Sequence, residues 1–202
     1  MTILRYKSVS CQEAILAIKP LTPKKRLLQT AEKMFYRYGY RAIGVDAISA
    51  ESGIGKMTLY RHFQTKDDLI AEYLQDNNEN FWKLFEEVTG WTKDPREKLM
   101  AFFQALGEYV NDPQCYGCPH LNVSVEYPQS GYAGHKIALA HKLSVRKRFQ
   151  ELAESAGTHD PEQLANQLVL LMDGAYMAAR VYGASNPGGS VASAAKTLIE
   201  NS

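Results

Sequence analysis

The sequence predicts an all-α protein in which a small N-terminal helical domain precedes a larger helical domain. Its long apolar segments repeat with the 3.6-residue period of amphipathic helices, and no segment alternates with period two for long enough to build a sheet. Residues 121–125 alternate briefly and stay ambiguous between helix and strand. Three expected helices begin with a capping residue followed by proline, a favoured helix start: Thr22-Pro23, Asp94-Pro95 and Asp160-Pro161.

Residues 22–67 are expected to form the small domain, after an N-terminal extension at residues 1–21. Its second helix ends at Ser52-Gly53, where glycine can take the positive φ that turns the chain sharply. A short third helix follows, with Leu59 and Phe63 one turn apart and facing inward. The first helix, which starts at Thr22-Pro23, carries its apolar residues on one face: Leu27, Leu28, Ala31, Met34, Phe35 and Tyr38.

Residues 68–202 are expected to form the larger domain, although its first helix begins at a capping box of Thr65 and Asp68. That helix runs to Gly90 with inward residues Tyr73, Leu74, Phe81, Leu84, Phe85 and Val88. The next helix starts at Asp94-Pro95 and buries Leu99, Phe102, Phe103, Leu106 and Val110. Residues 112–134 are rich in Pro and Gly and are expected to be irregular. A long helix from His135 follows, with Leu139, Leu143, Phe149 and Leu152 inside.

The helix expected over residues 161–182 carries two adjacent apolar stripes. Packing on one core needs a single stripe about 100° wide, so two stripes indicate burial against two surfaces. The alternative is a central helix within a monomer. We expect a homodimer built on residues 161–182 and 190–201, the last helix following the break GASNPGG and carrying Val191, Ala195 and Leu198. The first stripe is Leu164, Leu168, Leu171, Ala175, Ala178 and Tyr182. The second stripe is Ala165, Val169, Met172, Tyr176 and Ala179.

The outer face of the third helix is rich in hydrogen-bond donors. It carries two fixed cations and no carboxylate between Lys56 and Lys66, whereas ordinary solvated faces usually mix both signs. A short donor-rich helix presented on a tight turn is typical of a recognition helix in the DNA major groove. The alternative is an ordinary solvated helical hairpin. The donors on this face are Lys56, Thr58, Tyr60, Arg61 and His62.

Residues 24–75 resemble the DNA-binding domain of the TetR family of bacterial transcriptional regulators. The chain departs from the family pattern at Ile43-Gly44, because Gly44 is a weaker cap than the Thr or Ser that the family often has there. The match rests on Ala31, Phe35, Gly39, Tyr40, Val45, Ile48, Ser52-Gly53, Lys56, Thr58-Leu59-Tyr60, His62-Phe63, Lys66 and Leu69.

The resemblance implies a homodimer that binds double-stranded operator DNA. We expect a repressor that a small-molecule effector releases from its operator. The start of the recognition helix, at Lys56, Met57 and Thr58, is expected to reach base edges, with Arg61 on the same exposed face. Phosphate contacts are expected from Tyr60, His62 and Lys66, and from the amide of Val45 at a helix N-terminus.

The charge distribution supports the same division. Residues 1–70 carry twelve Lys and Arg against six Asp and Glu, whereas residues 71–202 carry eleven against sixteen. A basic N-terminal third on an otherwise acidic chain is typical of a nucleic-acid-binding domain joined to a domain with another task. Arg5, Lys7 and Lys19 are expected either to form a basic arm reaching DNA or to lie in a disordered tail.

No stretch approaches the length of about 20 apolar residues that a membrane span needs. Residues 1–19 also lack the continuous apolar run of a signal peptide. We therefore expect a cytoplasmic protein without a membrane partner. The effector, the operator sequence and the regulated genes are not encoded in any recognisable motif.

The larger domain holds an unusual share of aromatic and sulfur-containing side chains. An apolar cavity with a few polar groups is how a small-molecule site is built, although an aromatic stripe at helical spacing is also common in a plain core. The expected effector residues are Trp82, Phe103, Tyr109, Asn122, Glu126, Met172 and Tyr176.

Cys115 and Cys118 have the C-x-x-C spacing of a redox pair or half a zinc site. A zinc site needs two more ligands, and only His120 is near in sequence. We expect two reduced thiols, and the alternative function is a thiol-redox or metal-sensing protein. His135 and His141 are expected to be solvated, and no catalytic or cofactor motif is present, so we predict neither an enzyme nor a bound cofactor.

Overall fold

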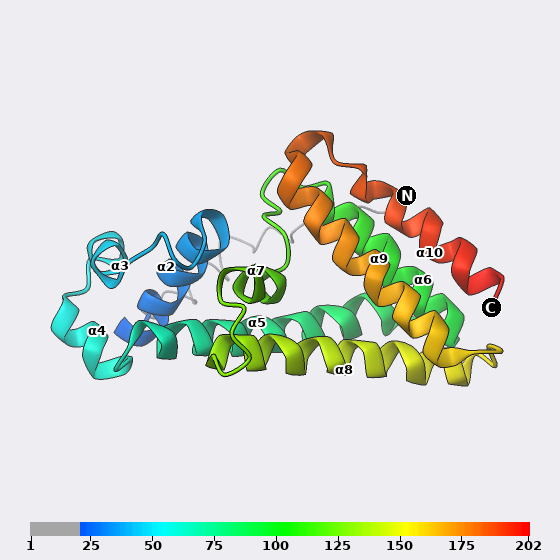
Figure 1. Cartoon of the computed structure of the whole chain (residues 1–202), viewed down its shortest axis with the longest axis horizontal. Coiled ribbons are helices and arrows are strands. Elements are labelled where there is room, and N and C mark those ends of the chain that lie inside the picture. The colour runs from blue at the N-terminus through cyan, green and yellow to red at the C-terminus, as the bar shows by residue number, and fades with distance from the viewer. Residues whose placement is uncertain (1–20) are drawn as a thin grey trace, which may run out of the picture.

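The computed structural model describes residues 21–202, and over this range the chain is helical without a strand (Figure 1). This confirms the all-α prediction, whereas the expected basic arm at Arg5, Lys7 and Lys19 lies outside the described residues. The elements in chain order are α2 (Pro23–Tyr38), α3 (Val45–Ser52), α4 (Lys56–His62), α5 (Lys66–Thr89), α6 (Pro95–Val110), α7 (Pro119–Glu126), α8 (Ala133–Ser155), α9 (Pro161–Tyr182), the 3₁₀ turns η1 (Gly183–Ser185) and η2 (Pro187–Ser190), and α10 (Val191–Glu200).

Side-chain caps fix where several helices begin, because they satisfy amides that lack a partner in the first turn. The Thr22 hydroxyl accepts a hydrogen bond from the Lys25 amide at 3.3 Å. At the start of α5 the capping box is complete, since the Asp68 amide donates to Thr65 Oγ1 at 3.1 Å and the Thr65 amide donates to Asp68 Oδ2 at 2.8 Å. These helices therefore begin where the sequence predicts.

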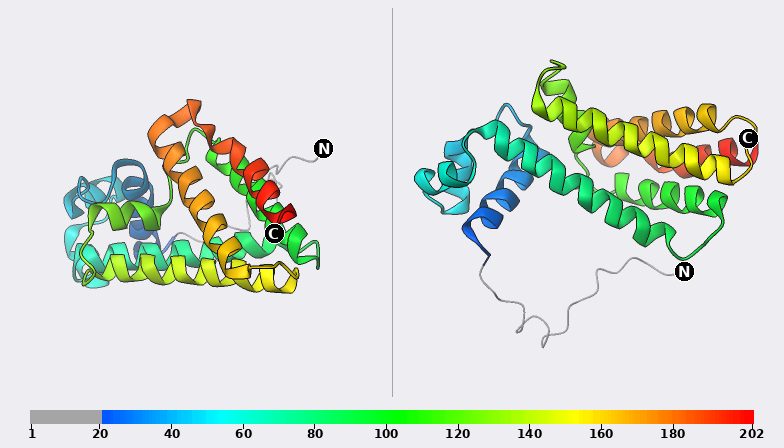
Figure 2. Two further views of the ribbon diagram at one scale, coloured as in Figure 1. Left: turned by 45° about the vertical axis from the view of Figure 1, so that its right-hand side comes forward. Right: turned by 90° about the horizontal axis from the view of Figure 1, so that it is seen from below.

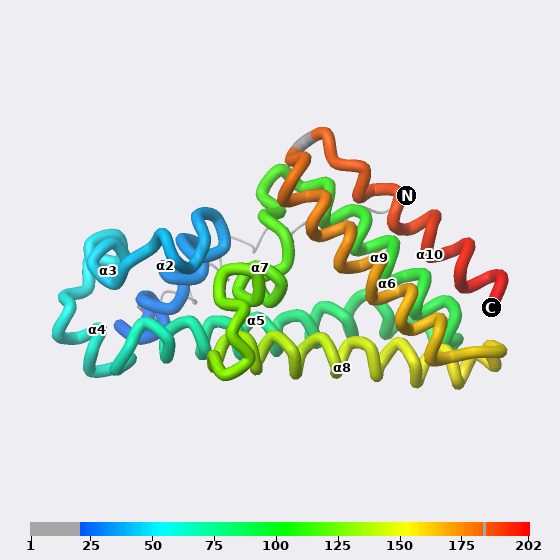
Figure 3. The backbone as a smooth tube through the Cα atoms, in the orientation of Figure 1, coloured from blue at the N-terminus to red at the C-terminus, as the bar shows by residue number. Residues whose placement is uncertain are grey.

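The helices form two groups joined by a long pair. α5 and α8 run side by side along the molecule (Figures 1 and 2). α2, α3 and α4 cluster at one end, while α6, α9 and α10 pack together at the other (Figure 3). α7 lies between the two groups, against α5 and α8.

Two apolar cores correspond to these groups. The core of the larger group is centred on Phe85, Phe103 and Phe149, which are all buried. The smaller core holds the inward faces of α2, α3 and α4, but α5, α7 and α8 also contribute to it. The helix-turn-helix is therefore completed by residues from outside it: Leu69, Ile70, Tyr73, Leu74, Val123 and Ala138.

The irregular segment predicted at residues 112–134 contains a helix. α7 begins with Pro119 at its first position, and it resolves the ambiguity of residues 121–125 in favour of helix. Its inward residues are His120 and Val123, so the apolar signal is too short to show a helical period. The packing of α7 against α5 and α8 stabilises this short helix.

The inward face of α8 differs from the prediction. Leu139 and Leu143 are both 53% exposed, whereas His141, expected to be solvated, is only 5% exposed. His141 lies two residues from each of these leucines, a rotation of about 200° around the helix, so burying the face that carries His141 turns both leucines toward solvent. Tyr38 and Leu84, also expected inside, are exposed at 55% and 47%.

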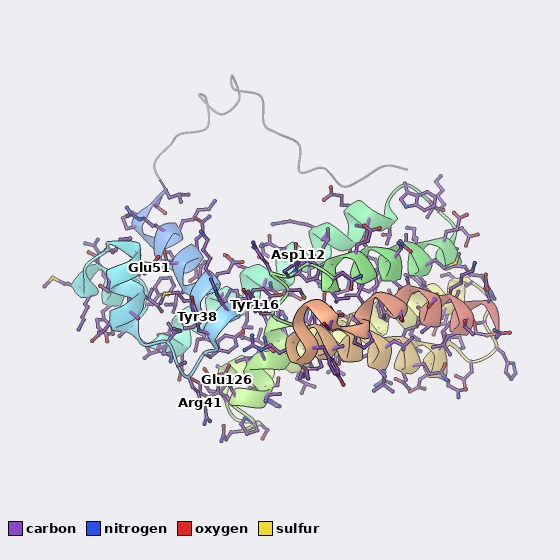
Figure 4. All side chains as sticks on the ribbon, turned by 90° about the horizontal axis from the view of Figure 1, so that it is seen from above. Tyr38, Arg41, Glu51, Asp112, Tyr116 and Glu126 are labelled. Carbon is purple, nitrogen blue, oxygen red and sulfur yellow. The ribbon has the colours of Figure 1, made fainter. Side chains whose placement is uncertain are left out.

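α7 is tied to the small domain by a carboxylate. Glu126 accepts hydrogen bonds from the backbone amides of Tyr40 at 2.9 Å and Arg41 at 2.7 Å, just after the end of α2 (Figure 4). Gly39 has a φ of 91°, and a Cβ there would lie 2.9 Å from Glu126 Oε1. Glycine therefore allows both the turn and the close approach of the carboxylate.

Replacing Glu126 with Gln should lower the free energy of unfolding by about 1–3 kcal/mol, because charge-assisted hydrogen bonds to two amides are weakened. Urea denaturation of Glu126→Gln measures the effect, and Glu87→Gln, at an exposed position on α5, is the matched control. Equal denaturation midpoints for the two variants would contradict the role assigned to Glu126.

Candidate nucleic-acid interface and internal cavity

α4 is held in place by its apolar side and presents the other side to solvent. Leu59 and Phe63 are buried, as predicted, while Met57 is 89% exposed. The turn before it uses Gly53 at a φ of 66° as the C-cap of α3. The α3–turn–α4 unit lies at the extreme end of the molecule (Figure 1), so its exposed face is open to a large partner. The polar side chains on that face are Lys56, Thr58, Tyr60, Arg61 and His62.

Lys56 is not a free cation in this arrangement. Its ammonium lies 2.7 Å from Asp46 Oδ1 in the first turn of α3. The hydrogen bond and the charge of Asp46 raise the pKa of Lys56. The α4 sequence contains no carboxylate, but the neighbouring helix supplies one, and the pair links the two helices.

Lys66 and Val45 lie at two further helix starts. Lys66 Nζ is 6.0 Å from the centroid of the Phe35 ring, and partial burial lowers the pKa of this lysine. Val45 is the first residue of α3, and its N-cap Gly44 makes no side-chain cap hydrogen bond. The first amides of α3 therefore lack a side-chain partner, which is the arrangement that favours an anion.

A partly open cavity of about 180 Å³ lies in the larger domain, beside the middle of α5. Its wall is mostly aromatic and aliphatic and comes from α5 to α9 and the segment before α7. Of the expected effector residues, Tyr109, Met172 and Tyr176 line it. The other lining residues are Asn77, Asn80, Phe81, Leu84, Phe85, Val88, Phe102, Ala105, Leu106, Gly117, Cys118, Pro119, His120, His141 and Lys142.

Four expected effector residues do not line this cavity. Phe103 is fully buried in the core, and Trp82 packs its ring against Phe81 and Phe85 at centroid distances of 5.2 and 5.6 Å. Asn122 donates to the Tyr116 carbonyl at 3.0 Å, and Glu126 binds the turn after α2. These four residues lie on helices that also carry cavity-lining residues, which is why the sequence pattern groups them with the cavity. Their positions around each helix point them away from it.

A stacked pair of histidines forms one side of the cavity. The rings of His120 and His141 lie 3.9 Å apart at an interplanar angle of 13°. His120 Nε2 lies 3.2 Å from the Leu74 carbonyl, which only accepts, so this nitrogen carries the proton. His141 Nδ1 lies 2.8 Å from Asn78 Oδ1. No motif in the sequence marks this pair, since its members are 21 residues apart.

Both histidines stay neutral near pH 7. Burial and the charge of Lys142 lower the pKa of His120 to about 4, and burial with the charges of His120 and Lys142 lowers that of His141 to about 2. Lys142 in turn is paired with Asp173 on α9. The cavity wall therefore carries one cation, and a carboxylate neutralises it.

Cys115 and Cys118 lie in the segment before α7 and are both buried and free. Burial raises the pKa of the Cys115 thiol, which disfavours the thiolate needed for redox chemistry. Within residues 21–202 no group of three or more His, Cys, Asp or Glu side chains is placed to hold a metal. The structure does not support the thiol or metal alternative.

The same described range contains no helix that is long and apolar enough to cross a membrane.

Comparison with known proteins identifies two family regions. Residues 27–73 match the model of bacterial regulatory proteins of the tetR family, and residues 95–195 match the tetracyclin repressor-like C-terminal domain. The HTH-type transcriptional activator FasR of Mycolicibacterium smegmatis is 32% identical over 149 residues, covering 72% of this chain and 67% of FasR. The HTH-type transcriptional repressor KstR2 of the same organism is 30% identical over 92 residues, covering 46% of this chain and 45% of KstR2.

Solved structures agree with these matches over nearly the whole chain. A putative TetR transcriptional regulator from Streptomyces avermitilis superposes with a TM-score of 0.80 at 30% identity, covering 90% of this chain and 98% of that one. A TetR-family regulator from Streptomyces coelicolor gives 0.79 at 30% identity, covering 87% and 91%.

Folding stability should decrease below pH 6.5 because of the histidine pair. In the unfolded chain these imidazoles bind protons near pH 6.5, whereas in the folded chain they resist protonation down to about pH 4 and 2. Each therefore lowers the free energy of unfolding by up to about 1.4 kcal/mol per pH unit below 6.5. Urea denaturation between pH 7.5 and 5 measures the slope.

His120→Phe should flatten this dependence, and His159→Gln, at an exposed position, should leave it unchanged. Identical slopes for the wild type and His120→Phe would show that His120 titrates normally.

Proposed function

The chain belongs to the TetR family of bacterial transcriptional regulators, and we propose that it acts as a homodimeric repressor that leaves its operator when a small molecule fills the cavity. One observation carries the proposal. α5 begins at Lys66, directly beside α4, and its middle forms one wall of the cavity through Phe81 and Phe85. A single rigid helix therefore connects the DNA-facing end with the candidate ligand site.

The proposed DNA contacts divide into two classes. Met57 and Thr58, in the first turn of the exposed recognition helix, are proposed to read base edges in the major groove. Lys56 joins them only if it exchanges Asp46 for DNA, whereas Arg61 has no acidic partner among the described residues. The proposed phosphate contacts are Tyr60, His62, Lys66 and the amide of Val45.

The proposed dimer interface lies on α9 and α10. Leu170, Val181 and Tyr182 on α9 are 71%, 68% and 61% exposed, which is unusual for a continuous helix face. An apolar groove of about 240 Å³ runs beside them between the two helices. Its lining is small or apolar and suits a close helix–helix contact: Leu170, Leu171, Gly174, Ala175, Ala178, Pro187, Gly188, Ser190, Val191 and Ala194.

The proposed switch is a shift of population between two dimer shapes. Two recognition helices must lie roughly 34–36 Å apart to enter successive major grooves. A ligand that prefers the shape with another spacing weakens operator binding, and operator weakens ligand binding by the same factor. In this proposal the dimer blocks a promoter while the ligand is absent and releases it when the ligand binds.

Substitutions on the DNA-facing surface should separate the two classes of contact. Lys66→Ala should weaken binding to all duplexes alike and reduce the slope of log affinity against log salt by about 0.9. Thr58→Ala should instead change which sequence is preferred. Fluorescence anisotropy at several salt concentrations, on duplexes selected by the wild-type protein from a random library, measures both effects.

The matched control is Lys147→Ala, at an exposed lysine in the second half of α8. A changed sequence preference with an unchanged salt slope in Lys66→Ala would contradict the assigned role. Unchanged affinity and preference in both Lys66→Ala and Thr58→Ala would argue against DNA binding by this surface.

Leu170→Glu should convert the dimer to a monomer, because a charge on each copy would be buried in the proposed apolar interface. Light scattering coupled to size-exclusion chromatography measures the molar mass. Leu139→Glu, at an exposed leucine of α8, is the control and should remain dimeric. A dimeric Leu170→Glu variant would place the interface elsewhere.

A further inference from the structure

The hydroxyl of Tyr36, near the end of α2, joins the DNA-binding domain directly to the cavity wall. It lies 2.9 Å from the Gly117 carbonyl, 3.0 Å from the Tyr116 amide and 3.0 Å from the Tyr109 hydroxyl. Gly117 and Tyr109 both line the cavity. Two groups of the candidate ligand site are therefore hydrogen-bonded to the first helix of the DNA-binding domain, independently of α5.

The direction of each hydrogen bond follows from its partners. The Gly117 carbonyl only accepts, so Tyr36 donates its single proton there. The Tyr116 amide only donates, so Tyr36 accepts from it. Tyr109 must then donate its own proton to Tyr36. Burial raises the pKa of Tyr36 and of Tyr109, so both phenols keep their protons.

The cavity favours an uncharged ligand. Its lysine is paired with Asp173, and both histidines are neutral, so an ionised ligand would find no free counter-charge. The volume of about 180 Å³ suits one ring with a short substituent, because an engineered apolar cavity of about 150 Å³ binds benzene. The rings of Tyr109 and Tyr176, with centroids 6.2 Å apart, meet at one side of this space.

We propose that Tyr109 passes ligand occupancy to α2: an uncharged ligand with a hydrogen-bond acceptor accepts the hydrogen bond that the Tyr109 hydroxyl donates, Tyr36 loses that hydrogen bond, and α2 loosens from residues 115–117. The proposal rests on the proposed function, in that it names the ligand class and the contact by which the cavity acts. A second residue of the cavity wall, Pro119, is also hydrogen-bonded to the DNA-binding domain. Its carbonyl accepts a hydrogen bond from the Tyr40 hydroxyl at 2.9 Å.

Two probes of nearly equal shape test this proposal. Acetophenone carries a carbonyl acceptor, and α-methylstyrene replaces that oxygen with a methylene group. Calorimetry establishes binding of each probe to the full chain, and hydrogen–deuterium exchange is then measured at equal occupancy on peptides covering residues 34–44. Acetophenone should raise exchange in the last turn of α2 by roughly three- to tenfold, the effect of losing one neutral hydrogen bond. α-Methylstyrene should leave it within twofold.

Two variants extend the test. Tyr109→Phe removes the hydroxyl that donates to Tyr36. Exchange in α2 should therefore be raised already in the absence of a probe, and acetophenone should add less than twofold. Tyr38→Phe, at an exposed tyrosine of the same helix, should behave like the wild type. Equal effects of the two probes, a full acetophenone effect in Tyr109→Phe, or failure of acetophenone to bind would each overturn the proposal.

Operator affinity on the selected duplexes separates this inference from the proposed function. If acetophenone loosens α2 without changing operator affinity, the hydrogen-bond link stands and the ligand-responsive function fails. If a cavity ligand lowers operator affinity while α2 exchange stays constant, the function stands and the Tyr109 link is overturned.

Discussion

The hydrogen bonds of α7 and the segment before it to the end of α2 are the contacts on which the arrangement of the molecule depends. The Glu126 carboxylate binds two amides of the turn after α2, and the hydroxyls of Tyr36 and Tyr40 bind backbone atoms of residues 116–119. Arg180 of α9 adds hydrogen bonds to the carbonyls of Tyr36 and Tyr116 at 3.3 and 3.4 Å. The helix-turn-helix is therefore held by α5 on one side and by this polar junction on the other (Figure 4).

The same segment forms a wall of the cavity, so a ligand bound there would contact the residues that orient the two domains. Gly117 has a φ of 92°, and a Cβ there would lie 3.3–3.4 Å from Asn122, Arg180 and Tyr176. A tight backbone of this kind transmits a displacement, because packed interiors rearrange between discrete states instead of deforming smoothly. A ligand bound there would be favoured if uncharged, since the lysine of the cavity is paired and its histidines are neutral.

α9 serves both halves of this arrangement. Its inner face supplies Met172 and Tyr176 to the cavity and Leu168 to the core, while its outer face leaves Leu170 and Val181 exposed. Both apolar stripes seen in the sequence lie mainly on the inner face, and neither contains Leu170 or Val181. Dimerisation through the outer face would fix the positions of both cavities relative to each other, and hence the separation of the two α4 helices.

The sequence by itself determines the helical fold, most helix starts and the recognition helix. These features depend on neighbours within a few residues: Thr65 with Asp68, Gly53 in its positive-φ turn, and Leu59 with Phe63. It also indicates that the larger domain has an aromatic interior. It does not show α7, because eight residues with two buried positions carry too little periodicity.

Only the tertiary structure decides which residues form the cavity and the junction. His120 meets His141, and Tyr36 meets Tyr109, across 21 and 73 residues of sequence. Asp46 forms an ion pair with Lys56, and Glu126 accepts hydrogen bonds from the amides after Gly39 instead of lining the cavity. Such contacts depend on how whole helices are rotated and placed against each other. That rotation is fixed by the packing of both cores together, which no local pattern encodes.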